Sequence, residues 1–281
     1  MRILITGAAG MLGQDVCEAA WAAGHEPTAL ARSELDVTDD GAVHAAVAKA
    51  RPDIVVNCAA WTNVDGAEES YDAALAVNGP GAGNVARAAD ASGAWTIHVS
   101  SDYVFDGLKL TPYVESDVVG PISAYGRAKL QGELEVAQAA PASHTIVRSS
   151  WLFGAGGSCF PKTILRLAAE RDQLDVISDQ LGCPTFTGHL GAALVTLAGA
   201  PPLGVLHVAA AGDCSWFAFA REIVTAGGLE CEVRPISTDQ YPAAAARPPY
   251  SVLRSERGAP SLPHWRQGLH QFMSQTARAA A

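Results

Sequence analysis

Short apolar runs rich in β-branched residues alternate with longer segments of helical composition over the first 150 residues. Apolar runs bounded by turn residues are typical of strands buried on both faces of a sheet. The runs expected as strands are 2–6, 26–30, 52–60, 95–99 and 144–148, and the segments expected as helices are 14–23, 39–50, 71–91 and 121–139. This βα alternation predicts an α/β fold, a Rossmann-like, doubly wound parallel sheet with its strand-end loops on one rim.

The pattern changes after about residue 150, where the elements become shorter and more mixed. Helices are expected at 160–169, 189–200 and 215–226, and strands at 174–177 and 205–208. The proline-rich segment 247–253 is expected to be extended, because proline does not fit a helix interior. No repeat or low-complexity linker separates the two parts, so a smaller C-terminal lobe should pack closely on the first.

Composition and charge narrow the class of protein. The chain has 281 residues, of which 49% are apolar and 17% charged, as expected of a globular protein. Its net charge of −10 argues against nucleic acid or an anionic membrane as a partner, although a local site for a nucleotide remains compatible with it. The absence of a signal-like segment and of a long apolar run predicts a cytoplasmic location. Six scattered cysteines without a Cys-x2-Cys pair predict reduced thiols, with no disulfide framework or metal site.

A glycine-rich turn follows the first expected strand. Gly7, Gly10 and Gly13 have the spacing G-x2-G-x2-G and stand between a strand and a helix. Glycines let the backbone approach a pyrophosphate closely, and a helix N-terminus offers free N–H groups to it. The turn therefore predicts a dinucleotide site, and the alternative is a tight turn that binds nothing.

The end of the second strand bears on the choice of dinucleotide. Arg32 stands with a hydroxyl neighbour where proteins that prefer NAD usually have an acid, which favours the 2′-phosphate of NADPH. The alternative for Arg32 is a solvated surface residue, which would leave NADH as the cofactor. Asp36 is expected near the adenine, and the small residues that end the third strand leave room for the cofactor.

Ser101, Tyr125 and Lys129 are the candidate catalytic residues. Tyr125 and Lys129 are four residues apart, so on a helix their side chains lie on one face. A nearby ammonium should lower the tyrosine pKa towards neutrality, which suits a proton donor to a ketone oxygen. This spacing also occurs by chance on solvated helices, but the fourth strand should deliver Ser100 and Ser101 to the same rim.

Several motifs, taken together, resemble the extended short-chain dehydrogenase/reductase superfamily and, more narrowly, the dTDP-4-dehydrorhamnose reductase family. Beside the glycine turn they are Ser-Ser-Asp-Tyr-Val-Phe-Asp-Gly at 100–107, Tyr-Gly-Arg-Ala-Lys-x2-Gly-Glu at 125–133, Arg-Ser-Ser-Trp-Leu-Phe-Gly at 148–154, Asp-Gln-x-Gly-x-Pro-Thr at 179–185 and Arg-Pro-x2-Ser-x-Leu at 247–253. They occur in order from residue 2 to about residue 270.

The resemblance implies reduction of the 4-keto group of dTDP-6-deoxy-L-lyxo-4-hexulose by NADPH or NADH to give dTDP-L-rhamnose. It implies that Tyr125 is the general acid, Lys129 its partner and Ser101 the hydroxyl that orients the carbonyl. The residues expected at the cofactor are Gly7, Gly10, Met11, Leu12, Gly13, Arg32, Asp36, Val37, Ala59, Ala60, Trp61, Thr62, Val99, Tyr125 and Lys129. Those expected at the substrate are Val64, Ser101, Asp102, Tyr125, Trp151 and Arg247. The domains are then 1–150 for NAD(P) and 151–281 mainly for the substrate, with some segments returning to the first domain.

Other residues have weaker assignments. Lys162 is a second candidate for the substrate diphosphate, whereas His98, Trp216 and Trp265 are expected to be packing residues. The family resemblance also raises a magnesium-bridged dimer contact, but acids are not found near residues 189 and 281, so we expect a monomer or a homodimer without that bridge. The alternatives in function are another nucleotide-sugar 4-ketoreductase, an epimerase or dehydratase, and a non-catalytic NADP-binding regulatory subunit.

Overall fold

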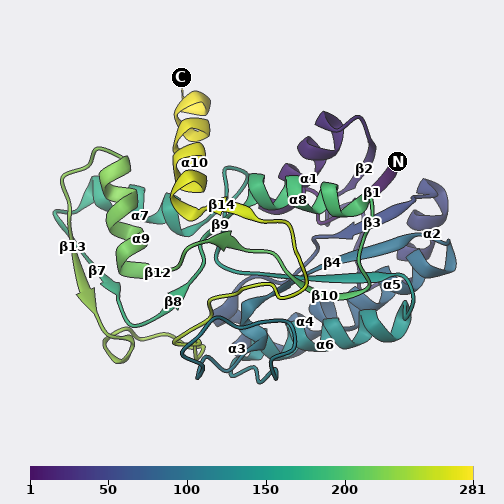
Figure 1. Cartoon of the computed structure of the whole chain (residues 1–281), viewed down its shortest axis with the longest axis horizontal. Coiled ribbons are helices and arrows are strands. Elements are labelled where there is room, and N and C mark those ends of the chain that lie inside the picture. The colour runs from purple at the N-terminus through teal and green to yellow at the C-terminus, as the bar shows by residue number, and fades with distance from the viewer. Residues whose placement is uncertain (281) are drawn as a thin grey trace.

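A six-stranded parallel sheet forms the centre of the computed structural model, which describes residues 1–280 (Figure 1). The strand order is β10-β5-β4-β3-β1-β2. The strands are β1 (Arg2–Thr6), β2 (Glu26–Leu30), β3 (Ile54–Asn57), β4 (Trp95–Ser101), β5 (His144–Ser149) and β10 (Gly204–His207). The predicted doubly wound α/β fold is confirmed, and a strand from the C-terminal part completes the sheet.

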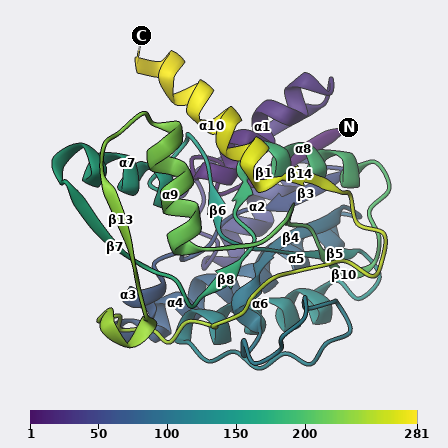
Figure 2. The ribbon, with the colours of Figure 1, turned by 60° about the vertical axis from the view of Figure 1, so that its left-hand side comes forward.

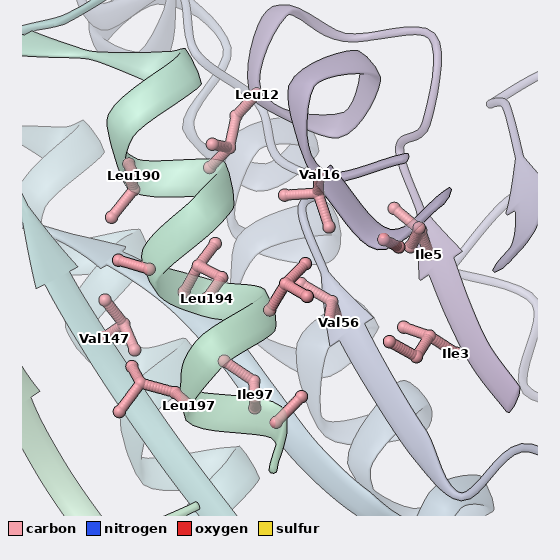
Figure 3. Close-up of a cluster of buried hydrophobic side chains, with 14 of the residues drawn as sticks. Ile3, Ile5, Leu12, Val16, Val56, Ile97, Val147, Leu190, Leu194 and Leu197 are labelled. Atoms are coloured by element: carbon pink, nitrogen blue, oxygen red, sulfur yellow. The ribbon is translucent and has the colours of Figure 1, made fainter. Parts of the chain in front are cut away.

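Helices cover both faces of the sheet because its central strands are apolar on both sides. The helices of the first 150 residues are α1 (Met11–Ala22), α2 (Asp40–Ala50), α3 (Val64–Glu69), α4 (Tyr71–Asn78), α5 (Pro80–Ala91) and α6 (Ala124–Ala139). Together with α8 (Thr187–Ala198), α1 packs on Ile3, Ile5 and Val56 of one face (Figure 3). Apolar residues of α2 and α5 pack on Leu4 and Val55 of the other face.

The order of the strands predicts where a ligand binds, because the chain extends the sheet first on one side of β1 and then on the other. From β1 the chain moves outward to β2, then returns to the other side of β1 for β3 and continues outward through β4 and β5. At such a reversal of strand order the loops at the carboxyl ends diverge and leave a crevice, where ligands bind in open α/β sheets.

A second core lies in the C-terminal part, beyond the carboxyl ends of the central strands (Figure 2). It contains buried aromatic residues such as Phe153, Phe186, Phe219 and Phe272. The helices here are α7 (Phe160–Glu170), α9 (Trp216–Ala226) and α10 (Trp265–Ala280). The short strands are β6 (Leu152–Phe153), β7 (Gln173–Ile177), β8 (Leu181–Gly182), β9 (Thr185–Phe186), β11 (Ala210–Ala211), β12 (Cys214–Ser215), β13 (Glu232–Ile236) and β14 (Leu262–His264).

Some elements differ from the sequence-based expectation. The segment 61–68, where the sequence predicted neither a helix nor a strand, contains most of α3, which begins where the Asn63 side chain accepts a hydrogen bond from the Gly66 N–H. The segments 150–157 and 179–185, where no strand was predicted, contain two-residue strands that pair with distant segments. The strand β13 and the helix α10 were not expected at all. Two-residue strands carry no periodicity, so only their tertiary partners define them.

Two negative findings concern the part of the chain that the structure describes. None of the helices within residues 1–280 is both long and apolar enough to cross a membrane. The six cysteines, all among the described residues, form no disulfide with one another in this structure.

Candidate functional site

A cavity of about 780 Å³ opens at the carboxyl ends of the central strands, between the sheet and the C-terminal part. With the exception of Lys162, every residue that the sequence analysis assigned to cofactor or substrate lines this cavity. Sequence reasoning missed further lining residues: Ala9, Leu35, Cys58, Val77, Ser100, Tyr103, Ser149, Leu152, Gly157, Ser158 and Trp216. Most of them are sequence neighbours of predicted residues. They could have been found by including every residue at the carboxyl end of an expected strand.

The glycine turn and the start of α1 form one end of the cavity. Gly7 has a φ of +65°, a conformation that favours glycine, and its carbonyl accepts a hydrogen bond from the Gly10 N–H. Gly10 caps α1 without a side-chain hydrogen bond, and the first turn contains no acidic residue. The first N–H groups of a helix have no intrahelical acceptors, so those of α1 are available to an anionic ligand. This donor set fits a pyrophosphate.

Arg32 and Asp36 stand near the same end, on the loop after β2. The Arg32 side chain is exposed and makes no ion pair with any residue among 1–280. Asp36 accepts hydrogen bonds from the backbone N–H and the hydroxyl of Thr38 at 3.0 and 2.8 Å, and these bonds lower its pKa. The Asp36 carboxylate thus stabilises the conformation of the loop, while the five N–H donors of the Arg32 guanidinium are available to a ligand.

Tyr125 and Lys129 lie one turn apart on α6, as their spacing predicted. The helix begins where the Ser123 hydroxyl accepts a hydrogen bond from the Gly126 N–H at 3.1 Å. The Lys129 ammonium is buried and donates to the Val99 carbonyl of β4 at 2.7 Å. The Tyr103 ring packs edge-on against Tyr125 at 5.5 Å between centroids. Helix and strand ends therefore bring the tyrosine, the lysine and Ser101 to one wall of the cavity.

The expected lowering of the Tyr125 pKa is wrong for this structure. Burial raises the pKa of Tyr125 to about 12, against a smaller opposing effect of a hydrogen bond with Ser101. Burial also lowers the pKa of Lys129 to about 8. The ammonium is bonded to a carbonyl rather than to the phenol, so desolvation dominates both groups.

Asp102 is a buried carboxyl in the cavity wall. Its side chain is 1% exposed, Oδ1 accepts a hydrogen bond from the Ser101 hydroxyl at 3.0 Å, and Oδ2 has no partner among the described residues. Burial raises the pKa of Asp102 to about 6, and the nearby Ser251 hydroxyl and the hydrogen bond from Ser101 oppose the shift. A carboxyl with a free oxygen in a cavity is available to a ligand hydroxyl.

We expect Asp102→Asn to stabilise the protein at pH 7 but not at pH 4. The folded-state pKa lies above the unfolded value of about 3.9, so the carboxyl costs stability as pH rises from about 4 to about 6. Thermal unfolding of both proteins across this pH range isolates the effect, since other carboxylates cancel in the difference. A difference between the two proteins that stays constant with pH would contradict the buried ionisation of Asp102.

Arg247 and Trp151 close the opposite side of the cavity, where the C-terminal part faces α3. Arg247 makes two hydrogen bonds to Asp65, at 2.7 and 3.1 Å. Trp151 stacks on Trp216 with 3.5 Å between ring centroids and 3° between planes. Trp216 therefore lines the cavity, which corrects the interpretation of Trp216 as a packing residue only. Trp265 is buried at 1% exposure, as expected of a packing residue.

Two further expectations concern residues outside the cavity wall. Lys162 does not line the cavity, and its ammonium donates to the Ala155 carbonyl at 2.6 Å, so the structure does not bring it to a diphosphate. His98 is buried as expected, and its Nδ1 lies 3.1 Å from the Asn57 amide nitrogen.

Within residues 1–280 no group of three or more His, Cys, Asp or Glu side chains is arranged to hold a metal ion. His189, near the position at which a dimer-bridging acid was considered, pairs with Gln271 at 2.9 Å. Residue 281, the other such position, lies outside the described residues.

Comparison with known proteins gives one consistent result. The family model described as "RmlD substrate binding domain" matches residues 1–278. The dTDP-4-dehydrorhamnose reductase of Mycolicibacterium smegmatis is 44% identical, over 97% of this chain and 85% of that protein. The dTDP-4-keto-6-deoxy-D-glucose reductase of Streptomyces niveus is 40% identical, over 96% of each. The crystal structure of the dTDP-4-dehydrorhamnose reductase of Bacillus anthracis in complex with NADP superimposes with a TM-score of 0.94 at 37% identity, over 98% of this chain and 99% of that one.

Proposed function

Because the chain belongs to the RmlD substrate binding domain family, which includes the dTDP-4-dehydrorhamnose reductases, we propose that it reduces a dTDP-4-keto-6-deoxysugar with NADPH. The product of the proposed reaction on dTDP-6-deoxy-L-lyxo-4-hexulose is dTDP-L-rhamnose. The observation that carries the proposal is the single cavity in which the glycine turn, Ser101, Tyr125 and Lys129 meet.

The N-terminus of α1 and Arg32 would hold the cofactor. The free N–H groups at Met11 and Leu12 face a pyrophosphate, and the unpaired Arg32 guanidinium suits a 2′-phosphate. Ala59, Ala60, Trp61, Thr62 and Val99 line the space between this end and Tyr125. When bound there, the nicotinamide supplies the hydride that adds to the sugar C4 carbon.

Tyr125 and Ser101 act on the carbonyl oxygen. The Ser101 hydroxyl, whose single hydrogen is donated to Asp102 Oδ1 in this structure, turns to donate it to the substrate oxygen, which it orients and whose developing charge it stabilises. Tyr125, whose raised pKa keeps it protonated at neutral pH, transfers its phenolic proton to that oxygen and gives the alcohol. The Lys129 ammonium stabilises the resulting phenolate until a solvent proton replaces the one transferred.

The remaining cavity residues support binding of the nucleotide sugar. Asp102, with one unpaired carboxyl oxygen, accepts a sugar hydroxyl, and Val64 and Trp151 supply apolar surface. The Arg247 guanidinium, oriented by its ion pair with Asp65, would bind the diphosphate of the nucleotide sugar. We assign residues 151–281 mainly to this substrate-binding lobe and residues 1–150 to the cofactor domain. The enzyme is proposed to work in the cytoplasm as a monomer or homodimer, without a nucleic-acid partner.

A second candidate differs only in the sugar. The relative from Streptomyces niveus is named for dTDP-4-keto-6-deoxy-D-glucose at the same level of identity as several dTDP-4-dehydrorhamnose reductases. Loss of NADPH absorbance with a panel of dTDP-4-keto sugars, each with NADPH and NADH, decides between the two. Tight NADPH binding without turnover of any of these sugars would overturn both and favour a non-catalytic regulatory subunit.

We expect Arg32→Ala to raise the KM for NADPH roughly ten-fold or more, since the substitution removes a charge-assisted contact to the 2′-phosphate. The KM for NADH, which has no 2′-phosphate, should stay unchanged and serves as the internal control. Initial rates at varied cofactor concentration give both values. Equal changes for the two cofactors would show that Arg32 does not recognise the phosphate.

A further inference from the structure

Trp151 has an unusual backbone conformation in the cavity wall. Its φ is +48°, in the left-handed region that residues other than glycine rarely adopt. Such a conformation costs free energy and persists only where its surroundings hold it. The side chain that it directs lines the proposed substrate side of the cavity.

Two short strand pairs hold the Trp151 backbone and bring Trp216 to it. The Trp151 carbonyl accepts a hydrogen bond from the Thr185 N–H at 3.2 Å, next to the pairing of β6 with β9. Strand β8 pairs antiparallel with β12, so that Gly182 lies opposite Cys214. Helix α9 begins directly after β12, at Trp216. Residues 151, 182 and 216 thereby meet at one point of the cavity wall.

The contact between the two indoles fixes the plane of the Trp151 ring. The rings are nearly parallel, with 3.5 Å between centroids, whereas aromatic pairs in cores prefer offset or edge-on arrangements. Phe160 packs behind Trp216 at 4.6 Å between centroids and joins it to the second core. Trp216 therefore links Trp151 in the cavity wall to the packed residues of that core.

Gly182 restricts the same ring from the backbone. A Cβ atom at this position would lie 2.3 Å from Cε2 and 2.5 Å from Nε1 of Trp151, closer than two such atoms can approach. The indole thus lies directly against the Gly182 Cα. With Trp216 stacked on one face and Gly182 against the Cε2 and Nε1 atoms, the ring has little freedom to tilt.

We propose that Trp216 is a positioning residue for the proposed reduction: it holds the Trp151 indole as a flat wall against the C–H-rich face of the 6-deoxyhexose. An apolar wall of fixed orientation suits a sugar that carries a methyl group at C6. This inference rests on the proposed function for the identity of the ligand. The arrangement itself rests on the stack, the left-handed Trp151 and the close approach of Gly182.

Two variants test the proposal by displacing the same ring in different ways. Trp216→Leu removes the stacked face, and Gly182→Ala introduces a methyl group where the ring now lies. Both should raise the KM for the dTDP-4-keto sugar roughly ten-fold or more, because small displacements of a positioning contact have large kinetic effects. The KM for NADPH should stay unchanged in both. Trp216→Phe, which keeps an aromatic face, should recover part of the loss.

Phe219→Leu is the matched structural control. Phe219 belongs to α9 and to the same second core, but it is buried and does not line the cavity. This variant should lower the melting temperature and leave the keto-sugar KM unchanged. If Trp216→Leu behaves like Phe219→Leu, with lower stability and an unchanged KM, the positioning role is overturned.

A readout without substrate separates this proposal from the proposed function. Residues in direct contact have non-additive effects on stability, so the losses of stability in Trp151→Leu and Trp216→Leu, measured by urea unfolding, should not add up in the double variant. Absent turnover of every keto sugar by the wild type would overturn the proposed function alone. Strictly additive losses in the double variant would overturn the stacked arrangement, whatever the activity.

Discussion

Tyr125→Phe is expected to lower kcat by about 10²–10⁴-fold, the usual effect of removing a general acid. The substitution removes only the phenolic oxygen, so the ring keeps its edge-on contact with Tyr103. The KM for NADPH should change little, because in the proposed binding mode the glycine turn and Arg32 hold the far end of the cofactor. Steady-state rates of NADPH oxidation with the keto sugar, together with cofactor titration, measure both effects.

Tyr103→Phe is the matched control for this experiment. Tyr103 lines the same cavity beside Tyr125, yet the mechanism assigns its hydroxyl no proton transfer. Its substitution should leave kcat within the same order of magnitude. Turnover of Tyr125→Phe that equals that of the wild type, or equal losses in the two variants, would remove Tyr125 from the role of proton donor.

The wall of the site built from the first five strands was predictable from the sequence, and the reason is topological. Parallel strands joined by right-handed crossovers place their carboxyl ends on one rim. Residues at the carboxyl end of a strand or in the loop that follows it, such as Gly10, Ala59 and Ser101, must then lie near one another, and all three line the cavity. Tyr125 and Lys129 follow from the helical period. The local sequence pattern and the fold class are therefore sufficient to predict this part of the site.

The residues that sequence reasoning missed depend on contacts between distant segments. Trp216 reaches the cavity only because β12 pairs with β8, and neither two-residue strand has a recognisable pattern. Asp65 faces Arg247 across 182 positions of sequence. The pKa of Tyr125 was expected to fall because spacing places Lys129 beside it, but spacing does not report burial or the Val99 carbonyl. Desolvation is a property of the folded environment.

A buried ion pair between α6 and β5 was also not predicted from the sequence. Glu133 lies one turn after Lys129 on α6, and Arg148 lies on β5. The Glu133 carboxylate accepts hydrogen bonds from Arg148 Nε at 2.9 Å and Nη2 at 2.6 Å, and from the Ser100 hydroxyl at 2.6 Å. Both charged side chains are only 5% exposed. Glu133 therefore connects α6, the helix of Tyr125, to β4 through Ser100 and to β5 through Arg148.

Glu133→Ala is expected to lower the free energy of unfolding by about 3–5 kcal/mol, because it leaves the Arg148 guanidinium buried without a counter-charge. Glu135→Ala is the control on the same helix, since Glu135 is half-buried and accepts a single hydrogen bond, from Gln131. It should cost about 1 kcal/mol or less. Urea unfolding of both variants gives the comparison.

The double variant Glu133→Leu with Arg148→Met then distinguishes a lost attraction from an uncompensated charge. Replacing both members of a buried pair by apolar residues is often neutral or stabilising, whereas removing one member is not. We therefore expect the double variant to be more stable than Glu133→Ala, although it lacks every hydrogen bond of the pair. If it is as unstable as the single variant, the cost lies in the lost contacts to Ser100 and the helix rather than in the buried charge. Its kcat separates the two roles further, because a recovered fold with low turnover would show that the ion pair also positions Ser101 and Tyr125.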